Sequence, residues 1–115
     1  MPMREIDVTE LQAFVAAERA AGRTPLLLDV REPWEVALGR IELAGAQSQA
    51  WPMHTLPARQ GELDPAQPVV CICHHGQRSA QVVAFLSHHG HPAAYNLAGG
   101  TDAWSREVDP ALPRY

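Results

Sequence analysis

The residue best suited to chemistry in this 115-residue chain is Cys73, which follows an apolar run and precedes a glycine-containing turn. The stretch reads Cys73-His74-His75-Gly76-Gln77-Arg78-Ser79. The thiolate, not the thiol, is the nucleophilic form of cysteine. Backbone N–H groups and a helix amino terminus stabilise negative charge, so they lower the pKa of a cysteine from its usual value of about 8.5. We therefore predict a reactive cysteine at position 73.

The turn after Cys73 is also predicted to form an anion pocket. Gly76 lets the backbone curl without a Cβ clash, so N–H groups of residues 74–79 can point at one spot. Arg78 adds a permanent positive charge. Such a cradle would hold an oxyanion or the terminal sulfur of a persulfide. The alternative from the local pattern alone is a buried cysteine before an ordinary strand-to-helix turn, because cysteine is frequently buried.

Two flanking elements would position this loop. Residues 69–73 are apolar, mostly β-branched and preceded by Pro68, which predicts a buried strand. Residues 79–88 carry apolar side chains at helical spacing, which predicts a helix that ends at Gly90. Cys73 would then lie at the carboxyl end of a strand, where open α/β sheets bind ligands.

The remaining elements alternate in the same way. Asp7 and Glu10 have the spacing of a capping box, and Thr101 is predicted to cap the last helix. The stretch from Arg40 to Trp51 is expected to be irregular around one short strand. The other predicted elements are helices at residues 11–21, 33–38, 55–60 and 101–104 and strands at 26–30 and 93–97. Alternation of strands and helices predicts one α/β domain, residues 1–115, with a mostly parallel sheet covered on both faces.

Composition excludes several classes of function. Apolar residues make up 46% of the chain, and 9 basic against 13 acidic residues give a net charge of −4. Without a basic run, binding to nucleic acid or to an anionic membrane surface is not expected. No stretch reaches the roughly 18 to 20 apolar residues of a membrane helix. The first seven residues lack the pattern of a signal peptide, which predicts a cytoplasmic protein.

Cys71 lies two residues before Cys73 on the same predicted strand. That spacing is poor for a disulfide between them, so core packing is expected for Cys71. Together with His74 and His75 the two cysteines are too tightly clustered to surround one ion, and we predict no metal and no cofactor. Asp29 and Arg31 are expected to form a structural ion pair. The three tryptophans, Trp34, Trp51 and Trp104, are expected to pack in the core or at its edge. Trp51 is also a candidate for the mouth of the pocket.

Three segments together resemble the rhodanese family of single-domain sulfurtransferases. They are Asp29-Val30-Arg31-Glu32 with Glu35, the Cys73–Ser79 loop, and Asn96-Leu97-Ala98-Gly99-Gly100 with Ala103-Trp104. The resemblance implies a three-layer α/β/α domain with a central five-stranded, mostly parallel sheet. Related phosphatases and arsenate reductases have a loop one residue longer. Here only four residues separate Cys73 from Arg78, and the smaller ring suits a single sulfur atom better than a phosphate.

The resemblance also implies a reaction and its partners. Cys73 would attack the sulfane sulfur of a small anionic donor such as thiosulfate and become a persulfide, and cyanide, a thiol or a sulfur-relay protein would accept the sulfur. The donor-binding residues would be His74, His75, Gly76, Gln77, Arg78 and Ser79. The alternative is a persulfide carrier or protein-interaction module with little turnover. Arg40 stands where many members have histidine, so specificity is expected to depend on the stretch from Arg40 to Trp51.

Overall fold

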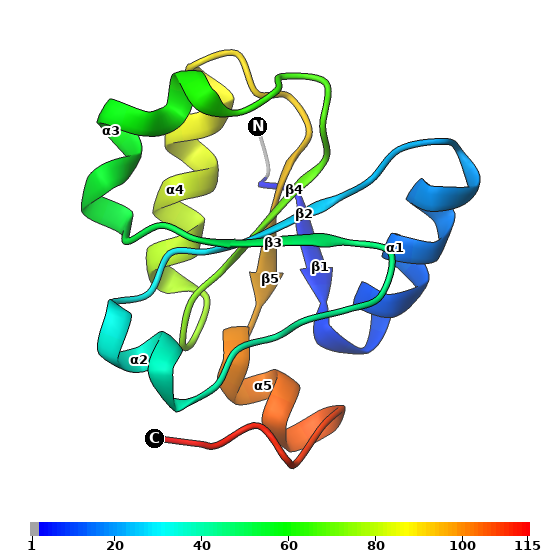
Figure 1. The fold of residues 1–115 in the computed structure, drawn as a ribbon, viewed down its shortest axis with the longest axis vertical. Coiled ribbons are helices and arrows are strands. Elements are labelled where there is room, and N and C mark those ends of the chain that lie inside the picture. Colours follow the sequence, from blue (N-terminus) through cyan, green and yellow to red (C-terminus); the bar gives the residue numbers. More distant parts are fainter. Residues whose placement is uncertain (1–2) are drawn as a thin grey trace.

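A computed structural model describes residues 3–115. Residues 1 and 2, which belong to the predicted domain and to the stretch searched for a signal peptide, lie outside the described residues. Its centre is one parallel sheet with the strand order β1-β5-β4-β2-β3 (Figure 1). The strands are β1 (Glu5–Asp7), β2 (Leu26–Asp29), β3 (Gln47–Ala50), β4 (Val69–Ile72) and β5 (Ala94–Ala98). This sheet confirms the predicted α/β architecture with five parallel strands.

Helices cover both faces of the sheet. The bounds are α1 (Leu11–Ala20), α2 (Pro33–Leu38), α3 (Leu56–Arg59), α4 (Gln77–His88) and α5 (Gly100–Glu107), with short 3₁₀ turns at Val8–Glu10, Met53–Thr55 and Gln60–Glu62. Helices α3 and α4 pack on one face, and α1 and α5 pack on the other (Figure 1). None of the helices within residues 3–115 is long and apolar enough to span a membrane.

Alternating side chains of the central strands build a core on each face. In β2, Leu26 and Leu28 face the layer of α3 and α4, whereas Leu27 faces the layer of α1 and α5. Every residue of β2 and β4 is buried, which explains why both strands read as continuous apolar runs. Burial of one such leucine contributes roughly 1.5 to 3 kcal/mol. The two cores fix the strands whose carboxyl ends carry the chemical groups.

Several local expectations are confirmed. The capping box between Asp7 and Glu10 is present, although it opens a 3₁₀ turn that leads into α1. Pro33 begins α2, and the cap residue at its end is Gly39. One short strand, β3, interrupts the irregular stretch between Arg40 and Trp51.

Other expectations are wrong. Strand β1 went unpredicted because it has three residues and one buried side chain, too few for a periodic signal. Helix α4 begins at Gln77, two residues before the predicted start at Ser79, because Gly76 adopts a left-handed conformation and serves as its N-terminal cap. Thr101 does not cap α5, because Gly99 takes that position. By contrast, the predicted helix at residues 55–60 is confirmed as α3, with 3₁₀ turns on both sides.

Trp34 does not pack in the core, because 63% of its surface is exposed. Successive residues of a helix point about 100° apart. In α2 the next side chain, Glu35, takes the inward direction, which leaves Trp34 outside. Trp51 and Trp104 are buried as expected, and the Arg59 guanidinium lies 3.9 Å above the centre of the Trp51 ring.

Candidate active site

Cys73 directly follows β4 at the carboxyl end of the sheet, with 1% of its surface exposed. Its Sγ accepts hydrogen bonds from the backbone N–H of Gly76 at 3.1 Å and from the backbone N–H of Ser79 at 3.4 Å. The Ser79 hydroxyl oxygen lies 3.3 Å from the same sulfur. The two N–H dipoles stabilise negative charge on sulfur without placing a charged atom against it.

The sequence of the loop explains this geometry. Gly76 has a φ of 97°, in the left-handed region that glycine adopts without a Cβ penalty. The chain therefore turns sharply into α4, and the N–H of Ser79 in the first helical turn points back at Cys73. The first N–H groups of a helix have no partner within the helix, so they remain free to bind the sulfur.

Asn96 on β5 holds the turn from the neighbouring strand. Its Nδ2 donates to the Gly76 carbonyl at 3.1 Å and to the Glu5 carboxylate at 3.2 Å. Because Nδ2 faces two acceptors, Oδ1 must face the Ser79 hydroxyl, with which it is hydrogen-bonded. Asn96 thus fixes both the loop backbone and the hydroxyl beside Sγ.

The Gly99-Gly100 pair lets α5 approach the loop closely. The N–H of Thr101 donates to the carbonyl of Cys73 at 2.9 Å, and the N–H of Asp102 donates to the carbonyl of His74 at 3.0 Å. A Cβ on Gly100 would lie 2.3 Å from the Cys73 oxygen, and the φ of Gly100 is +60°. The amino terminus of α5 therefore supports the loop from behind, which only glycine at position 100 permits.

Arg78 does not point freely toward an incoming anion. Its Nη1 and Nη2 donate to the two carboxylate oxygens of Glu35 at 2.6 and 2.7 Å. The Tyr115 hydroxyl donates to the same carboxylate at 2.7 Å. The Arg78 guanidinium lowers the pKa of Glu35 from 4.5 to about 2, with Tyr115 contributing and burial opposing.

Behind this pair lies the predicted structural ion pair, which is confirmed. The Arg31 guanidinium is buried and contacts the Asp29 carboxylate at 2.7 Å. It also donates to the carbonyl of Gly39 at 2.8 Å and to the Tyr115 hydroxyl at 3.1 Å. Asp29 and Arg31 therefore anchor α2 and the Tyr115 side chain against the end of β2.

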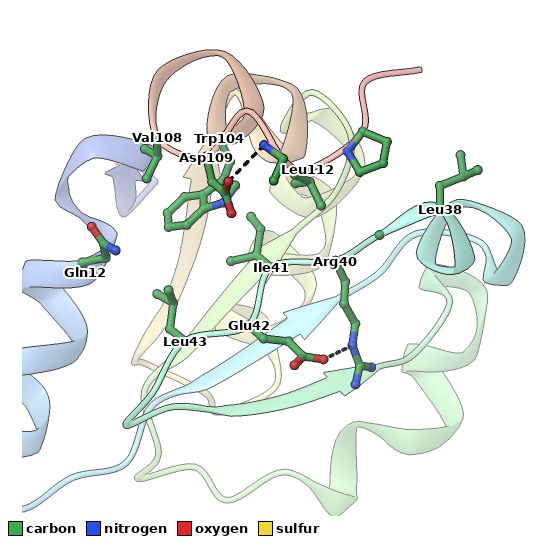
Figure 2. Close-up of a pocket in the computed structure, with 13 residues that line it drawn as sticks. Gln12, Leu38, Arg40, Ile41, Glu42, Leu43, Trp104, Val108, Asp109 and Leu112 are labelled. Carbon is green, nitrogen blue, oxygen red and sulfur yellow. Dashed lines mark hydrogen bonds and ion pairs between the residues drawn. The ribbon is translucent and has the colours of Figure 1, made fainter.

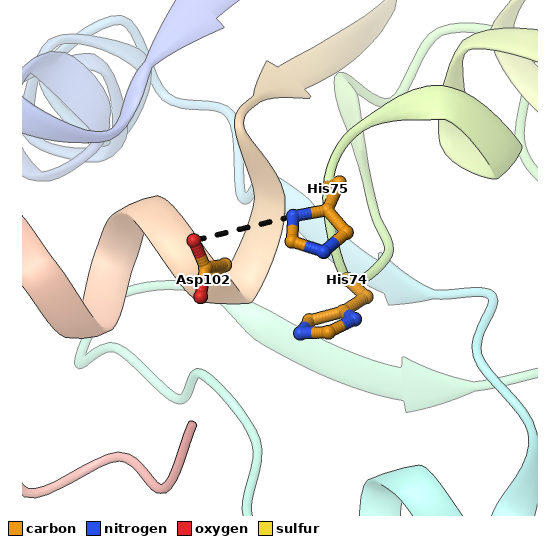
Figure 3. A group of neighbouring side chains, drawn as sticks. All are labelled: His74, His75 and Asp102. Atoms are coloured by element: carbon orange, nitrogen blue, oxygen red, sulfur yellow. Dashed lines mark ion pairs between the residues drawn. The ribbon is translucent and has the colours of Figure 1, made fainter. Parts of the chain in front are cut away.

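His74 and His75 lie on the outer side of the loop. The His74 ring stacks on the Tyr115 ring with centroids 3.9 Å apart, and burial lowers the pKa of His74 with help from His75. Figure 3 shows both histidines beside Asp102 of α5, and one potential ligand atom from each of the three lies within 4.8 Å of the others. Asp102 already pairs with Arg106 and Arg114, and these two positive charges disfavour a metal ion there.

The stretch that was expected to influence specificity lines a different hollow (Figure 2). A surface pocket of about 690 Å³ lies between residues 38–43 and the far end of α5, and Arg40 pairs with Glu42 at its edge. The described residues that line this pocket include none of the loop 73–79. Trp51 is buried in the core with α3 and α4, in the same cluster of side chains as Cys73.

Cys71 packs in that same core and is fully buried. Burial raises the pKa of its thiol far above the ordinary value, so Cys71 stays protonated and inert. Gln77 is the first residue of α4, and its side chain is exposed.

Sequence reasoning did not assign a site role to Glu35, Asn96 or Tyr115. Glu35 and Asn96 had been noted only as parts of the resembling segments, and Tyr115 had not been noted at all. A usable signal existed for Glu35, since its spacing from Glu32 matches a capping box that the structure contains. Tyr115 carries no such signal because its hydrogen-bond partners lie 80 or more residues away.

Comparison with known proteins shows the family and the fold of the chain. Residues 7–107 match the Rhodanese-like domain family, and the chain belongs to that family. A rhodanese-like domain protein from Staphylococcus aureus is 28% identical, with a TM-score of 0.75 and coverage of 98% of this chain and 99% of that one. The human single-domain sulfurtransferase TSTD1 is 25% identical, with a TM-score of 0.68 and coverage of 92% and 98%.

Two plant proteins are similar over most of this chain. The chloroplastic Rhodanese-like/PpiC domain-containing protein 12 of Arabidopsis thaliana is 32% identical over 99% of this chain and 38% of its own length. The adenylyltransferase and sulfurtransferase MOCS3-1 of Zea mays is 32% identical over 82% of this chain and 21% of its own length. The chain thus spans less than two-fifths of either plant relative.

Proposed function

We propose that the protein is a sulfurtransferase that carries a sulfane sulfur on Cys73, with thiosulfate or a similar compound as donor. The observation that carries the proposal is the Sγ atom of Cys73 held by the N–H groups of Gly76 and Ser79 at the amino end of α4. The human and maize relatives are named as sulfurtransferases, which supports the same chemistry here.

The reaction proceeds in two steps. The Cys73 thiolate attacks the outer sulfur of the donor, a new S–S bond forms, and sulfite leaves with the electron pair of the broken bond. The loop from His74 to Ser79 surrounds the sulfur, and its N–H groups stabilise the terminal sulfur of the persulfide. A thiol or cyanide then attacks that terminal sulfur, and the Cys73 thiolate is released.

A mass measurement tests the proposal. After incubation with thiosulfate and removal of excess donor, the intact protein should gain the mass of one sulfur atom, and cyanide should remove it. Cys73→Ser should abolish the gain. Cys71→Ala is the matched control, because the Cys71 thiol is fully buried and protonated and should leave the gain unchanged. Absence of any gain on wild-type protein would refute a persulfide on Cys73.

The second candidate is a persulfide carrier with little turnover of its own. It is favoured by the plant relatives, in which the similar region is a minor part of a longer protein. Turnover with thiosulfate and cyanide separates the two candidates. A carrier acquires sulfur on Cys73 but releases thiocyanate slowly, whereas an efficient enzyme does both with ping-pong kinetics.

A further inference from the structure

Glu35 neutralises the positive charge of Arg78, which the loop could otherwise offer to an anionic donor. Its two carboxylate oxygens each accept a hydrogen bond from Arg78, at 2.6 and 2.7 Å. This two-pronged pairing is the strongest arrangement between a guanidinium and a carboxylate, and it fixes the plane of the guanidinium. The pair has no net charge, so the field of Arg78 at the sulfur is largely cancelled.

The Glu35 carboxylate is a fixed part of the site. Only 4% of its side chain is exposed. Besides Arg78 it accepts a hydrogen bond from the Tyr115 hydroxyl at 2.7 Å and another from the Glu32 N–H at 3.0 Å. Tyr115 is in turn held by Arg31, which is itself paired with Asp29. These hydrogen bonds hold the Glu35 carboxylate in place, so it remains beside Arg78 when a donor binds.

The groups that contact Sγ are neutral. They are the N–H groups of Gly76 and Ser79 and the Ser79 hydroxyl. Backbone dipoles stabilise one negative charge on sulfur well, but they compensate two charges on one donor less completely. Thiosulfate is a dianion, whereas an organic thiosulfonate, which also carries a sulfane sulfur, is a monoanion.

We infer that Glu35 is a specificity-determining residue, which neutralises Arg78 and thereby favours monoanionic sulfur donors over dianionic ones. The inference rests on the proposed sulfur transfer. The bond changes are the same for both donors: the Cys73 thiolate forms an S–S bond to the sulfane sulfur, and the bond between that sulfur and the rest of the donor breaks. The electron pair leaves with sulfite from thiosulfate or with a sulfinate from the thiosulfonate.

Steady-state kinetics with cyanide as acceptor test this inference, with thiosulfate and benzenethiosulfonate as donors. Glu35→Gln leaves Arg78 unpaired, so the KM for thiosulfate should fall about fivefold and that for the thiosulfonate about twofold. Arg78→Gln leaves Glu35 unpaired, so the KM for thiosulfate should rise more than that for the thiosulfonate. The double variant, which restores neutrality, should return close to the wild-type ratio of the two KM values.

Each alternative outcome is informative, because KM does not depend on the fraction of protein that is folded. An unchanged ratio of KM values in all variants would overturn the inference while leaving the proposed function intact. Equal increases for both donors in both single variants would mean that the pair only maintains the fold of the loop, and would also overturn it. Failure of the wild-type protein to take sulfur from either donor would overturn the inference and the proposed function together.

Discussion

Replacing Glu35 by glutamine removes the negative charge that binds Arg78 but preserves the shape of the side chain. The pKa of Glu35 lies at about 2 in the folded protein against an ordinary value of 4.5. At 1.36 kcal/mol per pKa unit, this difference corresponds to about 3 kcal/mol of folding free energy at neutral pH. Because 35% of the Arg78 side chain is exposed, solvent screening weakens the pair, and we expect a loss of about 2 kcal/mol.

The loss should depend on pH with a defined sign. The pKa of Glu35 is depressed by folding, so its contribution is complete above about pH 4.5 and disappears as the pH falls toward about 2. Urea unfolding at pH 7 should give a free energy of unfolding about 2 kcal/mol lower for Glu35→Gln than for wild type. At pH 3 the difference between the two proteins should be less than about half of that value.

Glu42→Gln is the matched control, because Glu42 also pairs with an arginine, Arg40, but both side chains are exposed. Its effect should stay within about 0.5 kcal/mol at either pH. The reasoning is refuted if Glu35→Gln costs the same at pH 7 and pH 3, or if it costs no more than Glu42→Gln at pH 7.

Two further substitutions test the support of the loop. Gly100→Ala forces a Cβ to within 2.3 Å of the Cys73 carbonyl oxygen, so thermal unfolding should show a loss of about 2 kcal/mol or more. Gly61→Ala, where a Cβ meets nothing within 4 Å, should stay close to wild type, and similar losses in both variants would contradict the role assigned to the close approach. Asn96→Ala removes the hydrogen bonds to Gly76 and Ser79, so single-turnover sulfur loading should slow about tenfold, as expected for a loss of about 1.4 kcal/mol. An unchanged loading rate would mean that the turn keeps its shape without Asn96.

The contact between His74 and Tyr115 illustrates why part of the site escapes sequence reasoning. The two rings lie 3.9 Å apart, yet their residues are distant in the chain and neither belongs to a periodic pattern. Glu35 and Arg78 are likewise separated by 43 positions. Such pairs arise only after parallel crossovers bring α2, the loop and the last residues to the same end of the sheet.

Features that depend on residues close together in the chain were predictable from the amino-acid sequence. Apolar runs predicted β2 and β4, Pro33 and Gly39 bounded α2, and the cysteine and glycine of the loop predicted a nucleophile before a turn. These signals suffice because backbone hydrogen bonds and side-chain periodicity act over a few residues.

Which charged side chains pair with one another depends on the packing of distant segments. Arg78 was expected to face the donor, yet packing of α2 against the loop pairs it with Glu35. The same packing turns Trp34 to the surface, and the addition of β1 beside β5 brings Glu5 to Asn96. Burial makes such long-range pairing decisive, because a charged group without water must find a partner wherever the fold supplies one.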